Sequence, residues 1–104
     1  MQVAFAASEC TPFAKTGGLA DVVGALPREL VKLGHEVSVF LPFYSRVRKH
    51  IEGEPSYAIR SLTIPFRSYN RFVGVVDGGQ RDGVQYYFID SPELFDRKEQ
   101  ERKR

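Results

Sequence analysis

Apolar residues follow two different spacings along this 104-residue chain, and each spacing predicts its own secondary structure. Residues 3–7 are an unbroken apolar run, which is typical of a strand covered on both faces. Residues 8–18 predict a loop, and a helix follows whose apolar residues recur every three or four positions on one face. Gly34 is expected to end this helix, and Pro27 to kink it or to begin a second segment. The predicted apolar face consists of Leu19, Val22, Val23, Leu26, Leu30 and Leu33.

A second apolar run, residues 37–41, ends at Pro42 and completes a strand–helix–strand unit. Such a unit predicts two parallel strands joined by a right-handed crossover. Residues 45–51 then favour a short helix.

The second half of the chain predicts a hairpin and a return to the parallel sheet. Residues 56–66 and 72–76 favour two paired strands, and the apolar parity changes between Ile59 and Leu62, which indicates a bulge. Gly78-Gly79 and Asp82-Gly83 mark a turn. Residues 84–89 predict the returning strand, and residues 91–93 the start of a further helix.

Composition and charge narrow the class of protein. The apolar content of 42% is typical of a globular chain, and no apolar run reaches the roughly 20 residues of a membrane span. Residues 97–104 hold five basic and two acidic residues, a charge of +3, so a total of +2 leaves −1 for the rest. We therefore expect one domain over residues 1–97, a charged tail over residues 98–104, and neither a nucleic-acid nor a membrane partner.

The start of the chain and its cysteine content predict the compartment. The sequence begins on an apolar strand with no basic leader, and it has a single cysteine, Cys10. Both features favour a cytoplasmic location. Cys10 has no histidine or acid at a spacing typical of nucleophilic catalysis, so we expect a packed thiol.

The most informative motif joins the first predicted strand to the helix. Lys15 and the adjacent glycines Gly17 and Gly18 lie where backbone amides at a helix N-terminus point outward and favour negative charge. Glycines let a ligand approach the backbone, and lysine adds a full positive charge. This pattern predicts a phosphate or sugar-phosphate cradle, although a tight turn beside a surface lysine would have the same local sequence.

These residues also carry a family resemblance. The run from Lys15 to Val22, preceded by Ser8-Glu9 and followed by Gly24-Ala25-Leu26-Pro27, resembles the start of bacterial glycogen synthases and plant starch synthases, the glycosyltransferases of family 5. A looser resemblance continues to about Arg97. It covers only the beginning of the family, whose members are several times longer.

The resemblance implies a fold and a reaction. The fold would be α/β, a Rossmann-like parallel sheet with a β-hairpin insertion, forming part of the N-terminal domain of a GT-B glycosyltransferase. The parent enzyme would transfer glucose from ADP-glucose to an α-1,4-glucan acceptor, with retention of configuration. No cofactor or metal is expected, because cationic side chains would neutralise the leaving diphosphate. The resemblance puts most catalytic groups in a missing C-terminal part, so no catalytic residue is expected here and this chain alone would be inactive.

The resemblance also implies roles for single residues. Lys15 would contact the donor phosphates, while Gly17 and Gly18 would offer amides and room. Asp21 would either complement the helix dipole or bind a sugar hydroxyl, and Glu9 would either bind a glucan hydroxyl or stabilise the loop. The two histidines, His35 and His50, lack metal-ligand spacing and are expected at the surface.

Three other functions fit the same residues. The first is a related GT-B transferase that uses UDP-glucose. The second is a non-catalytic module that binds a glucan or an anion. The third is a structural fragment that folds only with its missing half.

Overall fold

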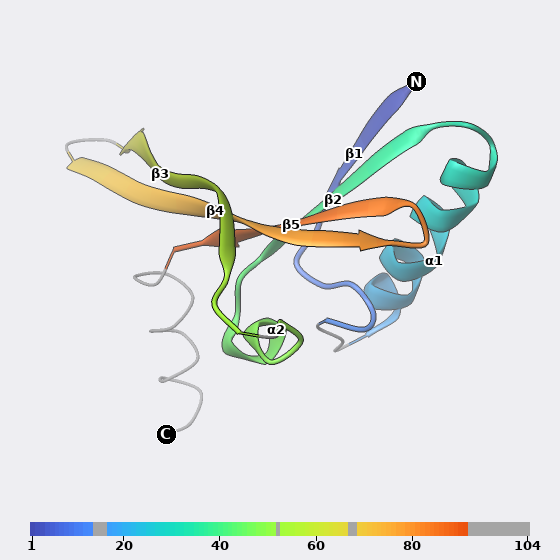
Figure 1. Ribbon diagram of the computed structural model, residues 1–104, viewed down its shortest axis with the longest axis horizontal. Helices are drawn as coiled ribbons and strands as arrows, with labels where there is room; N and C mark the ends of the chain where they lie inside the picture. Colours follow the sequence, from blue (N-terminus) through green and yellow to red (C-terminus); the bar gives the residue numbers. More distant parts are fainter. Residues whose placement is uncertain (14–16, 52, 67–68, 92–104) are drawn as a thin grey trace.

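Five strands form a single sheet in the order β1-β2-β5-β4-β3, with the helix α1 beside it (Figure 1). The computed structural model describes residues 1–13, 17–51, 53–66 and 69–91. The predicted helix start at residues 91–93 and the charged tail lie largely or wholly outside these ranges, so the boundary near residue 97 stays a prediction. The elements are β1 (Gln2–Ala6), α1 (Gly18–Lys32), β2 (Glu36–Pro42), α2 (Ser45–Arg48), β3 (Ser56–Phe66), β4 (Tyr69–Arg81) and β5 (Val84–Asp90).

The sheet is parallel at one end and antiparallel at the other. Strand β2 pairs in parallel with β1 on one side and with β5 on the other. Strand β4 runs antiparallel to β5, and β3 antiparallel to β4. The prediction of a Rossmann-like parallel sheet with a hairpin insertion is therefore confirmed, and the hairpin extends the same sheet.

The hairpin differs from its prediction in length and in the place of its glycines. Strand β4 is 13 residues long instead of the five expected, and the register shift between Asp77 and Gln80 puts Gly78-Gly79 at a bulge inside it. The turn is Asp82-Gly83 alone, with φ values of 54° and 81°. Asp-Gly suits such a turn because both positions require positive φ. The predicted bulge between Ile59 and Leu62 is confirmed by the register of β3 on β4.

The face that α1 turns toward the sheet is not the predicted one. The buried helix residues are Ala20, Val23 and Pro27, and the helix continues through the proline. Most of the predicted apolar face is instead exposed, namely Leu19, Val22, Leu26 and Leu33. The apolar residues cover a broad part of the helix surface, and the sheet covers only part of it. The buried face is therefore centred on Val23, at the side of the predicted face. The helix ends as expected, because the N–H groups of Gly34 and His35 bond the C=O groups of Val31 and Leu30.

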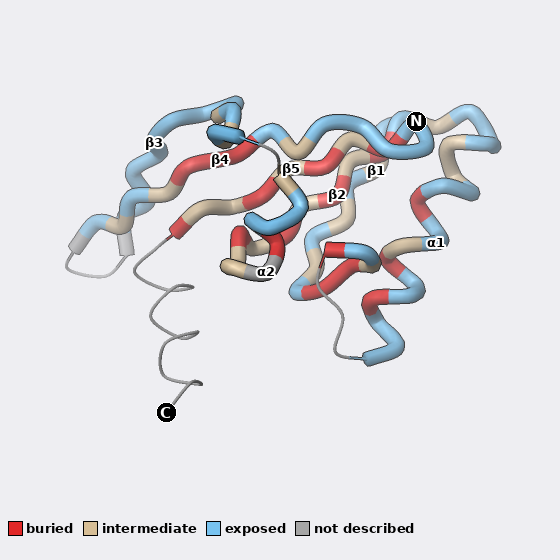
Figure 2. Tube along the Cα trace, turned by 60° about the horizontal axis from the view of Figure 1, so that its bottom comes forward, coloured by how far each residue is buried: buried red, intermediate tan, exposed pale blue. Residues whose placement is uncertain are grey.

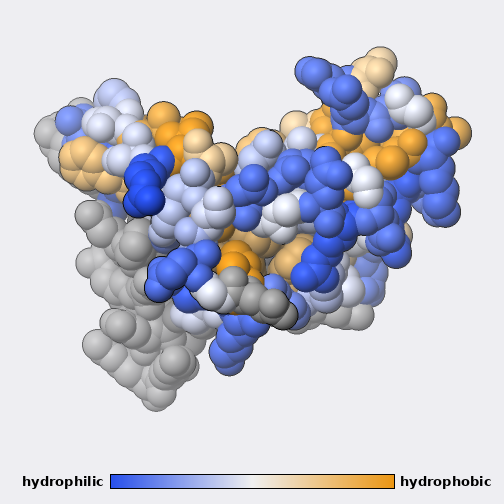
Figure 3. Space-filling view, viewed as in Figure 1, coloured by the Kyte–Doolittle hydropathy of each residue, from blue (hydrophilic) through white to orange (hydrophobic). Residues whose placement is uncertain are grey.

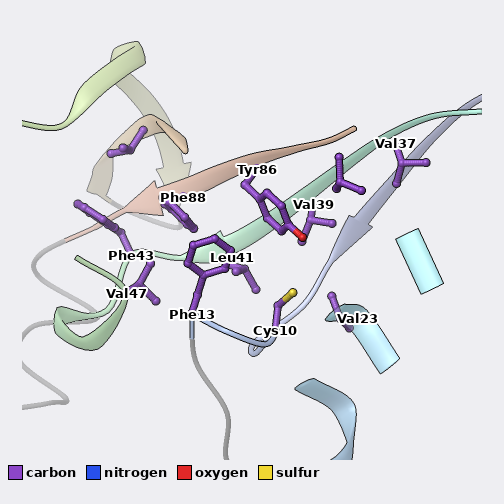
Figure 4. Packing of buried hydrophobic residues seen from close by; sticks show 12 residues of the cluster. Cys10, Phe13, Val23, Val37, Val39, Leu41, Phe43, Val47, Tyr86 and Phe88 are labelled. Carbon is purple, nitrogen blue, oxygen red and sulfur yellow. The ribbon is translucent and has the colours of Figure 1, made fainter. Parts of the chain in front are cut away.

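The hydrophobic core lies between the sheet, α1, α2 and the loop after β1 (Figure 4). Buried residues are concentrated in β2 and β5, whereas β3 is mostly exposed (Figure 2). Two loop residues, Cys10 and Phe13, belong to this core, and the Phe13 ring packs edge-on against Phe88 with centroids 5.2 Å apart. The loop is therefore anchored on the sheet by its own side chains.

Hydrophobic residues also reach the surface in separate patches among hydrophilic ones (Figure 3). One group lies on α1, as described above, and the other on the hairpin, at Ile59, Leu62, Ile64 and Phe72. Within the described ranges, no helix is long and apolar enough to cross a membrane.

A close approach between α1 and the loop after β1 generates the first prediction. A Cβ on Gly24 would lie 3.1 Å from the carbonyl oxygen of Thr11 and 3.2 Å from its Cβ. We expect Gly24→Val to lower the free energy of unfolding by about 1–3 kcal/mol, because the loop would have to move. Urea denaturation measures this change. The matched control is Ala25→Val, an exposed neighbour, for which only the helix-propensity cost of under about 1 kcal/mol is expected. Equal losses in both variants would contradict the packing argument.

Candidate functional site

The candidate site lies at the carboxyl ends of the parallel strands, where the chain leaves β1 and enters α1. In open α/β sheets, ligands bind beyond this edge of the strands. The edge is held together locally, since the Phe43 N–H after β2 donates to the Ile89 C=O of β5 at 2.8 Å. The loop after β1 carries Glu9, and Gly17 and Gly18 lie at the start of α1, so these three of the predicted site residues are near this edge.

Glu9 stabilises the start of α1 directly. Its side chain is buried, and its Oε1 accepts a hydrogen bond of 3.1 Å from the backbone N–H of Ala20. Ala20 is the third helical residue, whose N–H has no partner inside the helix. The carboxylate thus takes the part that a capping side chain usually plays, which Gly17, the N-cap residue, cannot supply. Of the two predicted roles for Glu9, the structure supports stabilisation; ligand contact stays a prediction.

The fold itself does not demand glycine at the two cradle positions. Gly17 has an extended backbone, with φ −168° and ψ −163°, which any residue can adopt. A Cβ on Gly17 would lie 3.8 Å from Oε1 of Glu9, an ordinary contact, and no described atom lies within 4 Å of a Cβ on Gly18. Within the described residues, the backbone at Gly17 and Gly18 therefore has room for a molecule that approaches it.

Asp21 lies on the flank of α1 that faces the β4–β5 turn. Its Oδ1 accepts a hydrogen bond of 3.2 Å from the Thr11 hydroxyl, and it lies in the first helical turn, where a negative charge is stabilising. Asp21 also lines an open hollow of about 340 Å³ between α1 and the β4–β5 turn, where Arg28 and Asp82 approach to 3.8 Å. Its predicted dipole role fits this geometry, and its contact with a sugar stays a prediction.

Lys15, the cation of the predicted cradle, lies outside the described residues, as do its neighbours at positions 14 and 16. Its predicted phosphate contact therefore stays a prediction.

Cys10 is a packed thiol, as expected. It is fully buried, and its Sγ donates to the Thr11 C=O at 3.4 Å. Burial raises the pKa of this thiol from 9.0 to about 11, so it is protonated at neutral pH. A buried, protonated thiol is a poor nucleophile, which argues against catalysis by Cys10.

The histidines differ from one another. His50 is exposed, as predicted, and packs edge-on against Phe13 with ring centroids 5.5 Å apart. His35 is half-buried instead of lying at the surface, and within the described residues its Nδ1 has no hydrogen-bond partner. In the same part of the chain, no three His, Cys, Asp or Glu residues come close enough to hold a metal ion.

One polar pair was not predicted. The Tyr57 hydroxyl donates to Oδ2 of Asp90 at 2.8 Å, which joins the base of the hairpin to the end of β5. This hydrogen bond to Asp90 is the main cause of the raised pKa of Tyr57. A carboxylate at the end of an apolar strand was the only sequence signal, because the partner is 33 residues away.

Comparison with known proteins places the chain in a family. A model of the starch synthase catalytic domain matches residues 2–101. The chain belongs to this family. The glycogen synthase of Koribacter versatilis is 58% identical over 97 residues, which are 93% of this chain and 19% of that protein. The glycogen synthase of Bacillus anthracis is 44% identical over 97 residues, or 93% of this chain and 20% of that protein.

A solved member of the family has a similar structure. It is the catalytic domain of starch synthase IV from Arabidopsis thaliana, bound to ADP and acarbose, with a TM-score of 0.61 and 29% sequence identity. The match covers 85% of this chain and 17% of that one. The chain thus spans about a fifth of the length of the curated starch and glycogen synthases it matches, and the likeness agrees with part of a GT-B domain.

The carboxylate at the start of α1 generates a prediction of stability. We expect Glu9→Ala to lower the free energy of unfolding by about 1–3 kcal/mol, because the buried Ala20 N–H loses its partner. Glu9→Gln keeps an oxygen acceptor and loses only the charge at the helix terminus, so its cost should be about 0.3–1 kcal/mol. Chemical denaturation of both variants tests the order. If Glu9→Gln lowered the free energy of unfolding more than Glu9→Ala does, the bond to Ala20 would not be the way in which Glu9 stabilises the fold.

The buried thiol generates a prediction of reactivity. At pH 8, iodoacetamide should alkylate Cys10 at least about 100-fold more slowly in the folded chain than in the chain unfolded by urea, since two pH units separate the pKa values. Mass spectrometry measures both rates. The raised pKa also stabilises the fold fully below pH 9, and this contribution is lost as the pH rises through 11. Rapid alkylation of a chain that keeps its circular dichroism would refute the assigned burial.

Proposed function

We propose that this chain is the first part of a glycogen synthase that elongates an α-1,4-glucan with glucose from ADP-glucose. The support is its identity of 58% with the Koribacter glycogen synthase and its likeness to a starch synthase bound to ADP and acarbose. The observation that carries the proposal is the start of α1 at the carboxyl edge of the parallel sheet. Two glycines lie there, although the contacts of the described residues would allow larger residues at both positions.

The proposed donor site uses the backbone more than side chains. A diphosphate that approaches the start of α1 would meet outward-pointing amides and the positive end of the helix dipole. Glycine at positions 17 and 18 lets it come within hydrogen-bond distance. Lys15 would add a compact positive charge that offsets the charge on the leaving diphosphate.

The two acidic residues nearby would have different roles. We infer that Glu9 is a positioning residue, because its buried carboxylate holds the Ala20 N–H and so fixes the helix turn that follows the glycines. Asp21 would repel a phosphate at close range, so a sugar hydroxyl is its proposed contact. The nucleotide pocket, the acceptor site and the remaining cationic groups would belong to the rest of the enzyme, and the proposed location is the cytoplasm, which suits a free, buried cysteine.

The proposal is tested in a chimera in which this chain replaces the matched 97-residue stretch of the Koribacter glycogen synthase. We expect the chimera to transfer labelled glucose from ADP-glucose to glycogen, and the 104-residue chain alone to show no transfer. Lys15→Ala in the chimera should lower kcat/KM for ADP-glucose by about 10- to 100-fold, the effect of one hydrogen bond to a charged group. Gly18→Ala should lower it too, while leaving the free energy of unfolding of the chain unchanged or slightly higher, since Ala favours the helix.

The result can contradict the proposal in three ways. Preference for UDP-glucose in the chimera would favour the related transferase. Binding of maltooligosaccharides by the chain without transfer in the chimera would favour a non-catalytic module. Full activity of Lys15→Ala and Gly18→Ala would show that these residues do not contribute to binding of the donor.

A further inference from the structure

A polar hollow lies between α1 and the β4–β5 turn, and the proposed reaction does not use most of the residues around it. Its volume is about 340 Å³, near the lower end of the range for small-molecule sites. It follows α1 from Asp21 to Arg28, which is about 10 Å of helix. Arg81 and Asp82 form its other side, and Tyr86 of β5 is the one buried residue among the described residues that line it. The hollow thus has the size and polarity of a site for one small polar molecule.

Arg81 contributes a positive charge to this hollow. Its guanidinium carbon lies 4.8 Å from the centroid of the Phe13 ring, which is buried. Within the described part of the chain, Arg81 forms no ion pair with a carboxylate. Stacking on a ring uses the face of the guanidinium group and leaves the N–H groups in its plane for another partner. Arg81 is therefore held in place and can still donate hydrogen bonds to a ligand.

Arg28 contributes a second positive charge, and its ion pair is weak. Its Nη1 lies 3.8 Å from Oδ2 of Asp82, and the two side chains are 49% and 67% exposed. A charge-assisted hydrogen bond would be about 2.7–2.9 Å long. An exposed pair at the longer distance contributes little to stability, so a stronger anion can displace Asp82 from Arg28.

Tyr86 connects the two arginines. Burial raises the pKa of Tyr86, whereas Arg28 and Arg81 act in the opposite direction. The hydroxyl is therefore protonated at neutral pH, and both guanidinium groups are near enough to act on its charge. Arg28, Arg81 and the Tyr86 hydroxyl thus form one cluster of hydrogen-bond donors.

A different kind of group lies further along the hollow. The Thr11 hydroxyl donates to Oδ1 of Asp21 at 3.2 Å, and both residues line the hollow. A carboxylate accepts hydrogen bonds from hydroxyl groups but repels a phosphate. The hollow therefore combines two cations with an acceptor that lies about two helical turns from Arg28.

We propose that this hollow binds a small phosphomonoester that carries hydroxyl groups, the phosphate of a sugar or of a sugar alcohol. Arg28 and Arg81 bind the phosphate, and Asp82 turns away from Arg28. Asp21 accepts a hydrogen bond from a hydroxyl group at the other end of the ligand. A phosphomonoester carries a charge of about −1.5 to −2 near pH 7, so it competes well with one carboxylate for the arginines. The site shares only Asp21 with the proposed donor site and does not depend on the proposed function.

Calorimetry with sorbitol 6-phosphate tests the proposal in the chimera described above. We expect binding that Arg28→Gln or Arg81→Gln weakens by about 10- to 100-fold, because each change removes hydrogen bonds to a charged group. The matched control is Arg60→Gln, which should leave the affinity unchanged. Arg60 also lies over an aromatic ring, that of Tyr57, but it does not line the hollow.

Asp82→Asn should change the affinity in the opposite direction. Asn tolerates the positive φ of this turn position, so the fold should be kept. Without the competing carboxylate, the affinity for sorbitol 6-phosphate should rise by about two- to five-fold. A variant that is merely less well folded would not bind more tightly, so a gain supports the proposal directly. A loss of affinity in Asp82→Asn would contradict it.

The chemistry and the place of binding are tested separately. Inorganic phosphate should bind about 10-fold more weakly than sorbitol 6-phosphate, because it cannot reach Asp21 with a hydroxyl group. Lys15→Ala should leave the affinity for sorbitol 6-phosphate unchanged. In NMR spectra of the 104-residue chain, the amides of Gly24 and Gly83 should shift on binding. Those of Gly17 and Gly18 should not shift.

Four results would each decide against a specific part of the scheme. No binding of sorbitol 6-phosphate, or equal affinity in the chimera with and without both arginine substitutions, would overturn the proposal. Equal affinity for inorganic phosphate would refute the part assigned to Asp21 and to the hydroxyl groups. Loss of binding in Lys15→Ala, or shifts only at Gly17 and Gly18, would assign the ligand to the start of α1. A chimera that binds sorbitol 6-phosphate as expected but transfers no glucose would refute the proposed function and leave this site standing.

Discussion

The position of α1 over the sheet depends on burial of the loop that precedes it. Cys10 and Phe13 lie in the core, between Val23 of the helix and the rings of β5, so the loop cannot shift without opening the core. Between these two anchors, the Thr11 N–H donates to the Ala20 C=O at 3.0 Å. The start of α1 is thus attached to the sheet through a segment that has no regular structure of its own. Such anchoring would suit the proposed binding site at the glycine-bearing helix start, because amides held in one direction reduce the ordering cost of binding.

Two opposing electrostatic effects meet at the candidate site. The dipole of α1 attracts anions, whereas the carboxylates of the protein repel them. Glu9 occupies one amide of the first helical turn, and Asp21 adds a second negative charge close by. These charges lower the affinity for an arbitrary anion. The proposed contact of a sugar hydroxyl with Asp21 would offset this repulsion, so the proposed donor site would favour a sugar phosphate over inorganic phosphate.

Much of the fold could be predicted from the sequence, because local patterns dominate it. The apolar runs at residues 3–7 and 37–41 predict two parallel strands, which are confirmed, although β1 is exposed or half-buried where its run predicts burial on both faces. Asp82-Gly83 predicts its turn from φ preferences alone. The orientation of α1 could not be predicted, since its apolar band is broad and the part that faces the sheet depends on contacts with the loop after β1, such as that of Gly24 with Thr11. The length of β4 was missed because its pairing with β5 carries the strand through two glycines. In the site, the sequence was enough to single out Glu9, Gly17, Gly18 and Asp21 as candidates. The bond between Glu9 and Ala20 could not be predicted, because it depends on how the loop folds back.

The hydrogen bond between Tyr57 and Asp90 has a mechanical consequence. Asp90 is the last residue of β5, and Tyr57 is near the start of the long hairpin that projects from the sheet. The bond spans β4, so it braces the hairpin against the end of β5 in addition to the strand pairing. A force on the projecting hairpin is therefore passed to Asp90, and the end of β5 and the tilt of the hairpin are mechanically coupled.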